Sequence, residues 1–250
     1  MTRGDSDPKP WWKQRRDESL KRKAAAAARP ACAGVGDAIL IVTEGVVTEP
    51  VYLELLRESL QLSTVTVKVM PGKASDPRHV IQTAVDEVDA LRKRVKKGQL
   101  AVDEVKQYDH VWAVIDTDVA TRGGFWNDVM QKADGKGVKL AHSTPCFEYW
   151  LLLHLKKTAR SDLVDGGFAK KAFKDELGMD YSTNREVAEK AIADILPDWP
   201  TAVLHAQEIR LGHESAGTVP PANPSTEVDL LACAMNDSAQ PHNRKIPCGS

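Results

Sequence analysis

The sequence lacks any long hydrophobic run. Its longest apolar stretches are five alanines at 24–28 and "WLLLHL" at 150–155, whereas a membrane-spanning helix needs about 18 or more apolar residues in succession. Neither stretch has the flanking pattern of a signal peptide. We therefore expect a protein that does not enter a membrane and that works in the cytoplasm.

Cysteine is also scarce. The chain has four cysteines, at Cys32, Cys146, Cys233 and Cys248. They show neither CxxC spacing nor a pairing pattern, which argues against a zinc site and against a disulfide framework. Reduced thiols, as in a cytoplasmic protein, are the expectation.

A strong excess of charge of one sign is missing, because the formal net charge is only −1. The overall balance therefore carries no signature of nucleic-acid binding. Residues 1–29 depart from this balance, with nine cations against four acids. We expect residues 1–36 to form a basic, largely disordered arm, which fits either a weak electrostatic contact with nucleic acid or a solvated tail.

A phosphate-binding loop is absent as well. The segment "EGVVTEP" at 44–50 holds one glycine and no lysine, so it does not match the GxxxxGK pattern that cradles nucleotide phosphates. Without an ATPase motif, any energy-driven or sensing step would need a partner protein.

Short strand patterns alternate with helical patterns from residue 37 to residue 157. The expected strands cover 37–45, 64–70, 107–116 and 138–143, and the expected helices begin at Thr48 as a cap, at Asp76 or Pro77, at Gly123, and at Thr144 with Pro145 in the first turn. Strict alternation of this kind predicts right-handed crossovers and a parallel sheet. We expect four parallel strands in the order 2-1-3-4, flanked by helices.

Beyond about residue 160 the pattern is helical, with no further strand. Asn223–Thr226 has the composition of a turn followed by a helix cap. The expected organisation is thus an α/β domain over 37–158 and a helical extension over 159–250 that ends in a flexible tail.

Three acids are expected to meet in this fold. Glu44 follows the first strand, and Asp116 and Asp118 end the third strand, in "VWAVIDTD". The order 2-1-3-4 makes these strands neighbours at the topological switch point, where α/β sheets place their functional crevice. Glu49, in the first turn of the following helix, can approach the same place.

Carboxylate oxygens without nitrogen or sulfur ligands suit Mg²⁺ or Mn²⁺. Such ions serve phosphoryl transfer and phosphodiester cleavage. The alternative is that these acids bind no metal. Glu44 would then be a solvated acid at a strand-to-helix turn, and a DxD at a strand end is a weak motif by itself.

Several other polar residues each fit two alternative roles. Glu148, among apolar neighbours, fits a further acid at the site edge or a helix N-terminal acid favoured by the dipole. Lys73, Arg78 and Arg122 are candidates for phosphate contacts or are solvated cations. His154 fits a packed helix histidine better than a ligand or general base.

These segments resemble a known family. An acid–glycine pair after the first strand and a DxD after the third are similar to the Toprim fold of primases and topoisomerases, a Rossmann-like arrangement. More specifically, "TEGVVTEPVYLELL", "VWAVIDTD", "STPCFEYWLLLHL" and "NPSTEVDLL" resemble the RloB family, found beside restriction and phage-defence genes. The resemblance covers about Ile39 to Leu231.

The resemblance implies a metal-dependent nuclease of DNA or RNA (tRNA included) in antiviral defence of the abortive-infection type. It implies Glu44 as catalytic acid/base or metal ligand, and Asp116 and Asp118 as Mg²⁺ ligands. A partner protein from a neighbouring defence gene is a further expectation. The alternative is a non-catalytic module that keeps the scaffold to bind nucleotide or nucleic acid.

Overall fold

The computed structural model describes residues 36–64, 66–72, 76–101 and 104–247. The predicted basic arm, apart from Gly36, and the last three residues of the predicted tail lie outside these ranges. The division of the chain at 158 stays a prediction.

The described residues form a five-stranded sheet with the order β2-β1-β3-β4-β5. Its strands are β1 (Ile39–Thr43), β2 (Val67–Pro71), β3 (His110–Asp116), β4 (Lys139–Thr144) and β5 (Ser225–Thr226). The first four are parallel, in the predicted order, and β5 is antiparallel to β4. The expectation of four strands was therefore incomplete. The segment Asn223–Thr226, which we expected to be a turn and cap, contains β5. The sequence did not predict this strand, because two residues are too few to show a strand period.

Helices connect and cover these strands within the described residues. They are α2 (Thr48–Ser59), α3 (Pro77–Lys96), α4 (Asp118–Arg122), α5 (Trp126–Lys136), α6 (Phe147–Leu155), α7 (Gly166–Leu177), α8 (Arg185–Ile195), α9 (Trp199–Ser215) and α10 (Val228–Ser238), with short 3₁₀ turns at Leu196–Asp198 and Pro241–Asn243. None of these helices is long and apolar enough to span a membrane.

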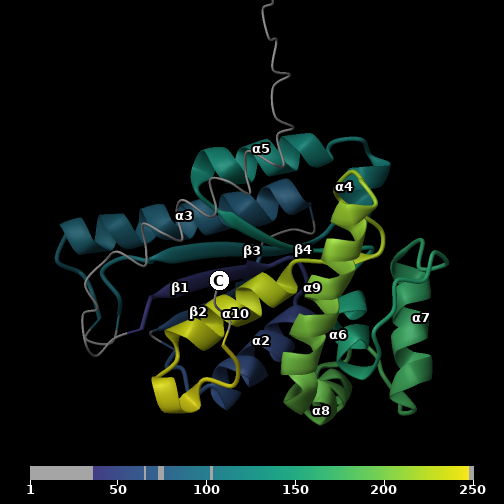
Figure 1. Ribbon diagram of the computed structural model, residues 1–250. Coiled ribbons are helices and arrows are strands. Elements are labelled where there is room, and N and C mark those ends of the chain that lie inside the picture. The colour runs from purple at the N-terminus through teal and green to yellow at the C-terminus, as the bar shows by residue number, and fades with distance from the viewer. Residues whose placement is uncertain (1–35, 65, 73–75, 102–103, 248–250) are drawn as a thin grey trace, which may run out of the picture. The chain divides into compact units, whose positions relative to one another are not determined.

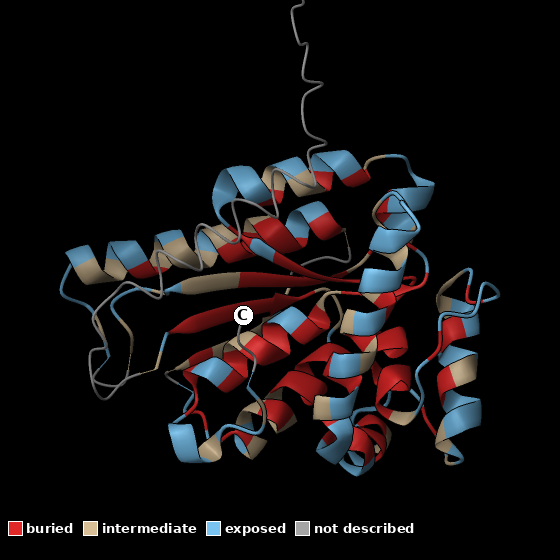
Figure 2. Cartoon of the chain, in the orientation of Figure 1, coloured by how far each residue is buried: buried red, intermediate tan, exposed pale blue. Residues whose placement is uncertain are grey.

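The inner parallel strands β1, β3 and β4 are largely buried, with helices on both faces of the sheet, as Figures 1 and 2 show, whereas the edge strand β2 is mostly half-buried. Ile39 and Ile41 face the core formed with α2, α6 and the C-terminal helices, whereas Leu40 and Val42 face the core formed with α3 and α5. Successive side chains of a strand point to opposite faces, so a strand covered on both sides must be apolar throughout. This explains the continuous apolar run of β1.

One of these cores crosses the predicted boundary at residue 158. Tyr149 and Trp150 of α6 belong to the same buried cluster as Phe173 of α7 and Leu231 of α10. Residues Phe147–His154 of α6 are all buried, as expected for a helix that is apolar on nearly every side.

Three local predictions were wrong. Thr48 is the first residue of α2 and makes no cap hydrogen bond; its hydroxyl instead contacts Tyr181. Pro145 precedes α6, which begins at Phe147. The helix expected from Gly123 begins only at Trp126, as α5, and a short unpredicted helix, α4, begins at Asp118, which was expected to end β3.

Other expectations hold in the described residues. Cys146 and Cys233 are buried and neither forms a disulfide. His154 is a packed histidine: it is buried and contacts the Tyr52 hydroxyl at 3.1 Å and the Trp150 carbonyl at 3.0 Å.

Candidate acidic site at the strand ends

Glu44 and Asp116 lie beside each other at the carboxyl ends of β1 and β3. The Glu44 N–H donates to the Val114 carbonyl at 2.9 Å, which continues the pairing of the two strands past Thr43. The Asp116 N–H donates to the Glu44 side chain at Oε2, at 3.1 Å. The parallel register thus brings together two acids that are 72 positions apart in the chain.

Asp116 also joins the sheet to α6. Its Oδ1 accepts a hydrogen bond from the Phe147 N–H at 2.9 Å, and Phe147 is the first residue of α6. Helix N-termini offer unpaired N–H groups that favour a carboxylate. Asp116 therefore lies at the junction of β1, β3 and α6.

Glu49 lies in the first turn of α2, and its side chain bends back to the β1–α2 turn. Its Oε1 accepts a hydrogen bond from the Gly45 N–H at 3.0 Å, and the residue is only 7% exposed. A Cβ atom at Gly45 would lie 2.0 Å from Glu49 Oε2. Only glycine therefore allows this approach, which gives the acid–glycine pair of the sequence a steric reason.

Asp118 lies two residues beyond the end of β3 and not on the strand, where it was expected. As the first residue of α4 it pairs with Arg122 one turn later, with Oδ2 2.9 Å from Arg122 Nη2. It still acts on its neighbours, because its charge raises the pKa of both Glu44 and Asp116.

Glu148, the second residue of α6, is 4% exposed. Its Oε1 accepts from the Tyr181 hydroxyl at 3.1 Å and lies 3.8 Å from Lys170 Nζ. The Tyr181 hydroxyl also lies 3.1 Å from the Thr48 hydroxyl on α2. Sequence reasoning missed Lys170 and Tyr181, because they come from the C-terminal helical segments and carry no motif that points to an acid over 20 positions away.

The acids share one electrostatic environment. Burial raises the pKa of Glu44 to about 7, and the negative charges of Glu49, Asp118 and Asp76 add to the rise. Burial also raises the pKa of Asp116 well above its usual range, and the negative charges of Glu49, Glu44, Glu148 and Asp118 raise it further. The pKa of Glu49 is raised by burial and then by Glu148. We call Glu44, Glu49, Asp116, Asp118 and Glu148 the acidic cluster.

The donor chemistry of the acidic cluster suits a hard divalent cation, since it offers carboxylate oxygens alone and excess negative charge. The side chains are not gathered around one point: in the described part of the chain, no three His, Cys, Asp or Glu residues are arranged to hold a metal. Glu44 Oε2 and Asp116 Oδ1 are turned toward backbone N–H groups. A cation would therefore need side-chain rotations of these two residues.

The predicted phosphate-binding cations are placed differently from one another. Arg122 is paired with Asp118 of the acidic cluster. Arg78, at the start of α3, pairs with Asp76 at 2.6 Å and lies over the Phe125 ring, 4.4 Å from its centroid; this pairing lowers the pKa of Asp76 to about 2. Lys73 lies outside the described residues.

The added strand β5 holds the end of β4 next to Asp116. Thr226 contacts the Ser143 hydroxyl through its own hydroxyl at 2.9 Å, and the Ser143 carbonyl accepts from the Thr117 N–H at 3.0 Å. Arg210 of α9 donates to the Thr226 carbonyl at 2.9 Å and forms a bidentate pair with buried Asp229 at 2.8 and 2.7 Å. Hydrogen bonds thus run from α9 and α10 to the DxD segment.

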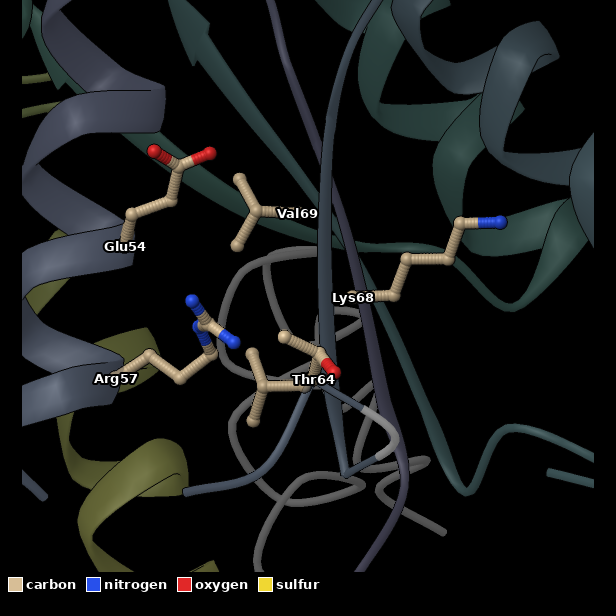
Figure 3. Close-up of a pocket in the computed structure, with 6 residues that line it drawn as sticks. Glu54, Arg57, Thr64, Lys68 and Val69 are labelled. Atoms are coloured by element: carbon tan, nitrogen blue, oxygen red, sulfur yellow. The ribbon is translucent and has the colours of Figure 1, made fainter. Parts of the chain in front are cut away.

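A pocket of about 140 Å³ lies elsewhere, between α2 and the edge strand β2 (Figure 3). Its walls include Glu54, Arg57, Thr64 and Lys68. No member of the acidic cluster lines it, and Glu54 is already paired with Arg185 at 2.7 Å. We therefore place the candidate site at the strand ends, where the carboxylates of the acidic cluster lie, and not in this pocket.

No curated protein and no solved structure matches the chain. A family model described as RloB-like protein matches residues 39–235, a span that holds all five residues of the acidic cluster together with β5 and Arg210. By this match the chain belongs to the RloB-like family.

Proposed function

We propose that this RloB-like protein is a nuclease that uses Mg²⁺ or Mn²⁺ to hydrolyse phosphodiester bonds of DNA or RNA. The observation that carries the proposal is the junction of Glu44 and Asp116 at the ends of adjacent parallel strands, with Glu49, Asp118 and Glu148 close enough to raise the pKa of Asp116. An acid–glycine pair after β1, a DxD after β3 and the strand order around them support a Toprim-type fold.

The members of the acidic cluster have different expected roles. Asp116 and Asp118, with Glu49, would hold the cation, and Glu44 would either join them as a ligand or act as the acid/base. When bound, the cation supplies Lewis-acid stabilisation of phosphate charge and lowers the pKa of water. Burial raises the pKa of Glu44 to about 7 in the metal-free chain, so Glu44, where it is not itself a ligand, has a pKa in the range that suits a general base. Tyr181 orients Glu148 at the edge of the cluster.

Defence against foreign nucleic acid is the biological setting we propose, on the basis of the family. Because the sequence has no phosphate-binding loop of the ATPase type, a triggering step would come from a partner protein. Co-purification of the tagged chain with the products of neighbouring genes tests this part of the proposal.

The nuclease proposal is tested with wild type and Asp116→Asn, incubated with duplex DNA, single-stranded DNA, tRNA and other RNA in Mg²⁺, in Mn²⁺ and in EDTA. We expect metal-dependent cleavage of at least one substrate by wild type. Asp116→Asn should lower the cleavage rate by ~100-fold or more. Mutation of a residue that only hydrogen-bonds to a metal ligand already lowers metal affinity or activity by ~10–100-fold, and Asp116 is an expected ligand itself. Asp134→Asn, an exposed acid on α5, is the matched control and should cut normally.

A second function has one observation in its favour. Because no three potential ligands of the described residues are already arranged around a metal, a non-catalytic module that binds nucleotide or nucleic acid is the competing proposal. It predicts binding of these ligands by calorimetry with no turnover in any metal. Cleavage by wild type that Asp116→Asn lacks would exclude it.

A further inference from the structure

Helix α7 places one lysine at the rim of the acidic cluster. Gly166 packs against Cys146, since a Cβ atom on Gly166 would lie 3.5 Å from the Cys146 side chain. Lys170 follows one turn later, on the same face of the helix. Its Nζ reaches within 3.8 Å of Glu148 Oε1. Figure 1 shows α7 standing beside α6, which carries Glu148.

The contact between Lys170 and Glu148 is loose. A distance of 3.8 Å is longer than the 2.7–3.2 Å of an N–H···O hydrogen bond, and the Lys170 side chain is 51% exposed whereas that of Glu148 is 5% exposed. Glu148 already accepts a hydrogen bond from Tyr181. The three N–H donors of the ammonium are therefore not committed to Glu148.

The other lysines of α7 behave differently. Lys171 donates to Asp175 at 2.6 Å and Lys174 donates to Asp180 at 3.1 Å, all at exposed positions. Lys170 alone among the three is directed at buried acids, and the charges of Glu148, Asp116 and Glu49 raise its pKa. It is consequently a protonated cation that faces the cluster and the solvent at once.

A nucleic acid that approaches five carboxylates is repelled unless cations accompany it. We propose that Lys170 binds a non-bridging oxygen of the phosphodiester backbone when a nucleic acid lies over the acidic cluster. This inference rests on the proposed function, since it names the group that contacts that substrate. It also gives the C-terminal helices a direct part in the site: α7 supplies a substrate contact that the sheet itself does not.

The experiment measures the affinity of Lys170→Gln, Lys170→Arg and the control Lys171→Gln for a labelled duplex DNA and a labelled tRNA transcript. Ca²⁺ replaces Mg²⁺ so that binding is measured apart from turnover. Each affinity is taken across a range of salt concentrations, because the loss of one phosphate contact lowers the slope of log affinity against log salt by about 1.

We expect Lys170→Gln to bind at least one probe ~10-fold more weakly, equal to about 1.4 kcal/mol, with the slope lowered by about 1. Lys170→Arg should keep the slope, and Lys171→Gln should match wild type. A probe bound normally by every variant identifies the nucleic acid that does not use the site. Lys170→Met, which keeps the aliphatic stem, repeats the measurement should the glutamine variant lose its thermal unfolding transition.

Equal slopes for Lys170→Gln and Lys171→Gln would overturn the inference, and so would the absence of wild-type binding to both probes. Cleavage is assayed separately in Mg²⁺. If wild type cuts while the slopes are equal, the nuclease proposal stands and the role of Lys170 fails. If wild type cuts nothing while the slope of Lys170→Gln falls, the reverse holds.

Discussion

At the scale of single residues, burial and mutual repulsion make the acidic cluster costly to ionise. Glu44 and Asp116 are brought together by strand pairing, and both have raised pKa values because burial and like charges penalise their ionised forms. Backbone N–H groups offset only part of that penalty. An assembly of this kind is expected where a positive ligand binds.

The raised pKa of Glu44 predicts a pH-dependent cost. Its pKa is 4.5 unperturbed and about 7 in the folded chain, so between these values the native state holds more protons than the unfolded state. Stability from this group is present below pH 4.5 and is lost as the pH rises toward 7. Without metal, Glu44→Gln should therefore gain stability over wild type by at most about 3 kcal/mol at pH 8, and by little at pH 4.5.

Urea unfolding of both proteins in EDTA from pH 4.5 to pH 8 gives this difference. The comparison must be between the two proteins, because buried His154, whose pKa is lowered to about 4, changes stability in the opposite sense over the same range. A difference in unfolding free energy that does not vary with pH would contradict the prediction.

At the scale of elements, the short strand β5 matters more than its two residues suggest. It fastens the end of β4, which in turn accepts from the Thr117 N–H beside Asp116. The fastening depends on Arg210, whose guanidinium bridges the Thr226 carbonyl and the fully buried Asp229. The segment "NPST", which contains β5, thus has a structural role at the candidate site.

Removing one partner of this buried pair should be costly. We expect Arg210→Met to lower the free energy of unfolding by about 3–5 kcal/mol, because Asp229 is left buried without its counter-charge. The double variant Arg210→Met/Asp229→Leu should lose less than the sum of the single variants. Additive losses in denaturant unfolding would show that the two residues do not act as a pair.

At the scale of the whole molecule, the helices after residue 158 share a buried core with the helices before it. Trp150 and Leu153 of α6 are buried in one cluster with Phe173, Ile192 and Leu231. The same helices bring Tyr181 and Lys170 to Glu148. Stability and the candidate site therefore depend on the same tertiary contacts.

A chain that ends at Thr158 should consequently fail to fold. Exposing side chains the size of Trp150 and Leu153 costs roughly 1.5–3 kcal/mol each, and several would be exposed together. We expect no cooperative thermal transition by circular dichroism and an expanded or aggregated species by size-exclusion chromatography, with the full chain as control. A cooperative transition in the truncated chain would show that residues 37–158 are a domain in their own right.

Much of the fold can be read from local pattern. The alternation of β-branched runs and amphipathic helices was enough to predict four parallel strands, because strands joined by helical crossovers run parallel. The expected order 2-1-3-4 is also the order found. The same alternation placed Glu44 and Asp116 at strand ends. The predictions failed where the local signal is short: at Thr48, at Pro145, at the five-residue helix α4, and at the two residues of β5.

The motifs alone were sufficient to identify the RloB-like family. "TEG", the DxD and "NPST" are each contiguous in the sequence, so they can be recognised before the fold is known. The surroundings of the acids depended on packing between distant segments. Asp118 turns toward Arg122 because a helix begins there, and Glu148 meets Tyr181 and Lys170 because α7 packs on α6. Burial and charge proximity are properties of the assembled core, so the raised pKa values and the lysine at the rim arise only when the chain is folded.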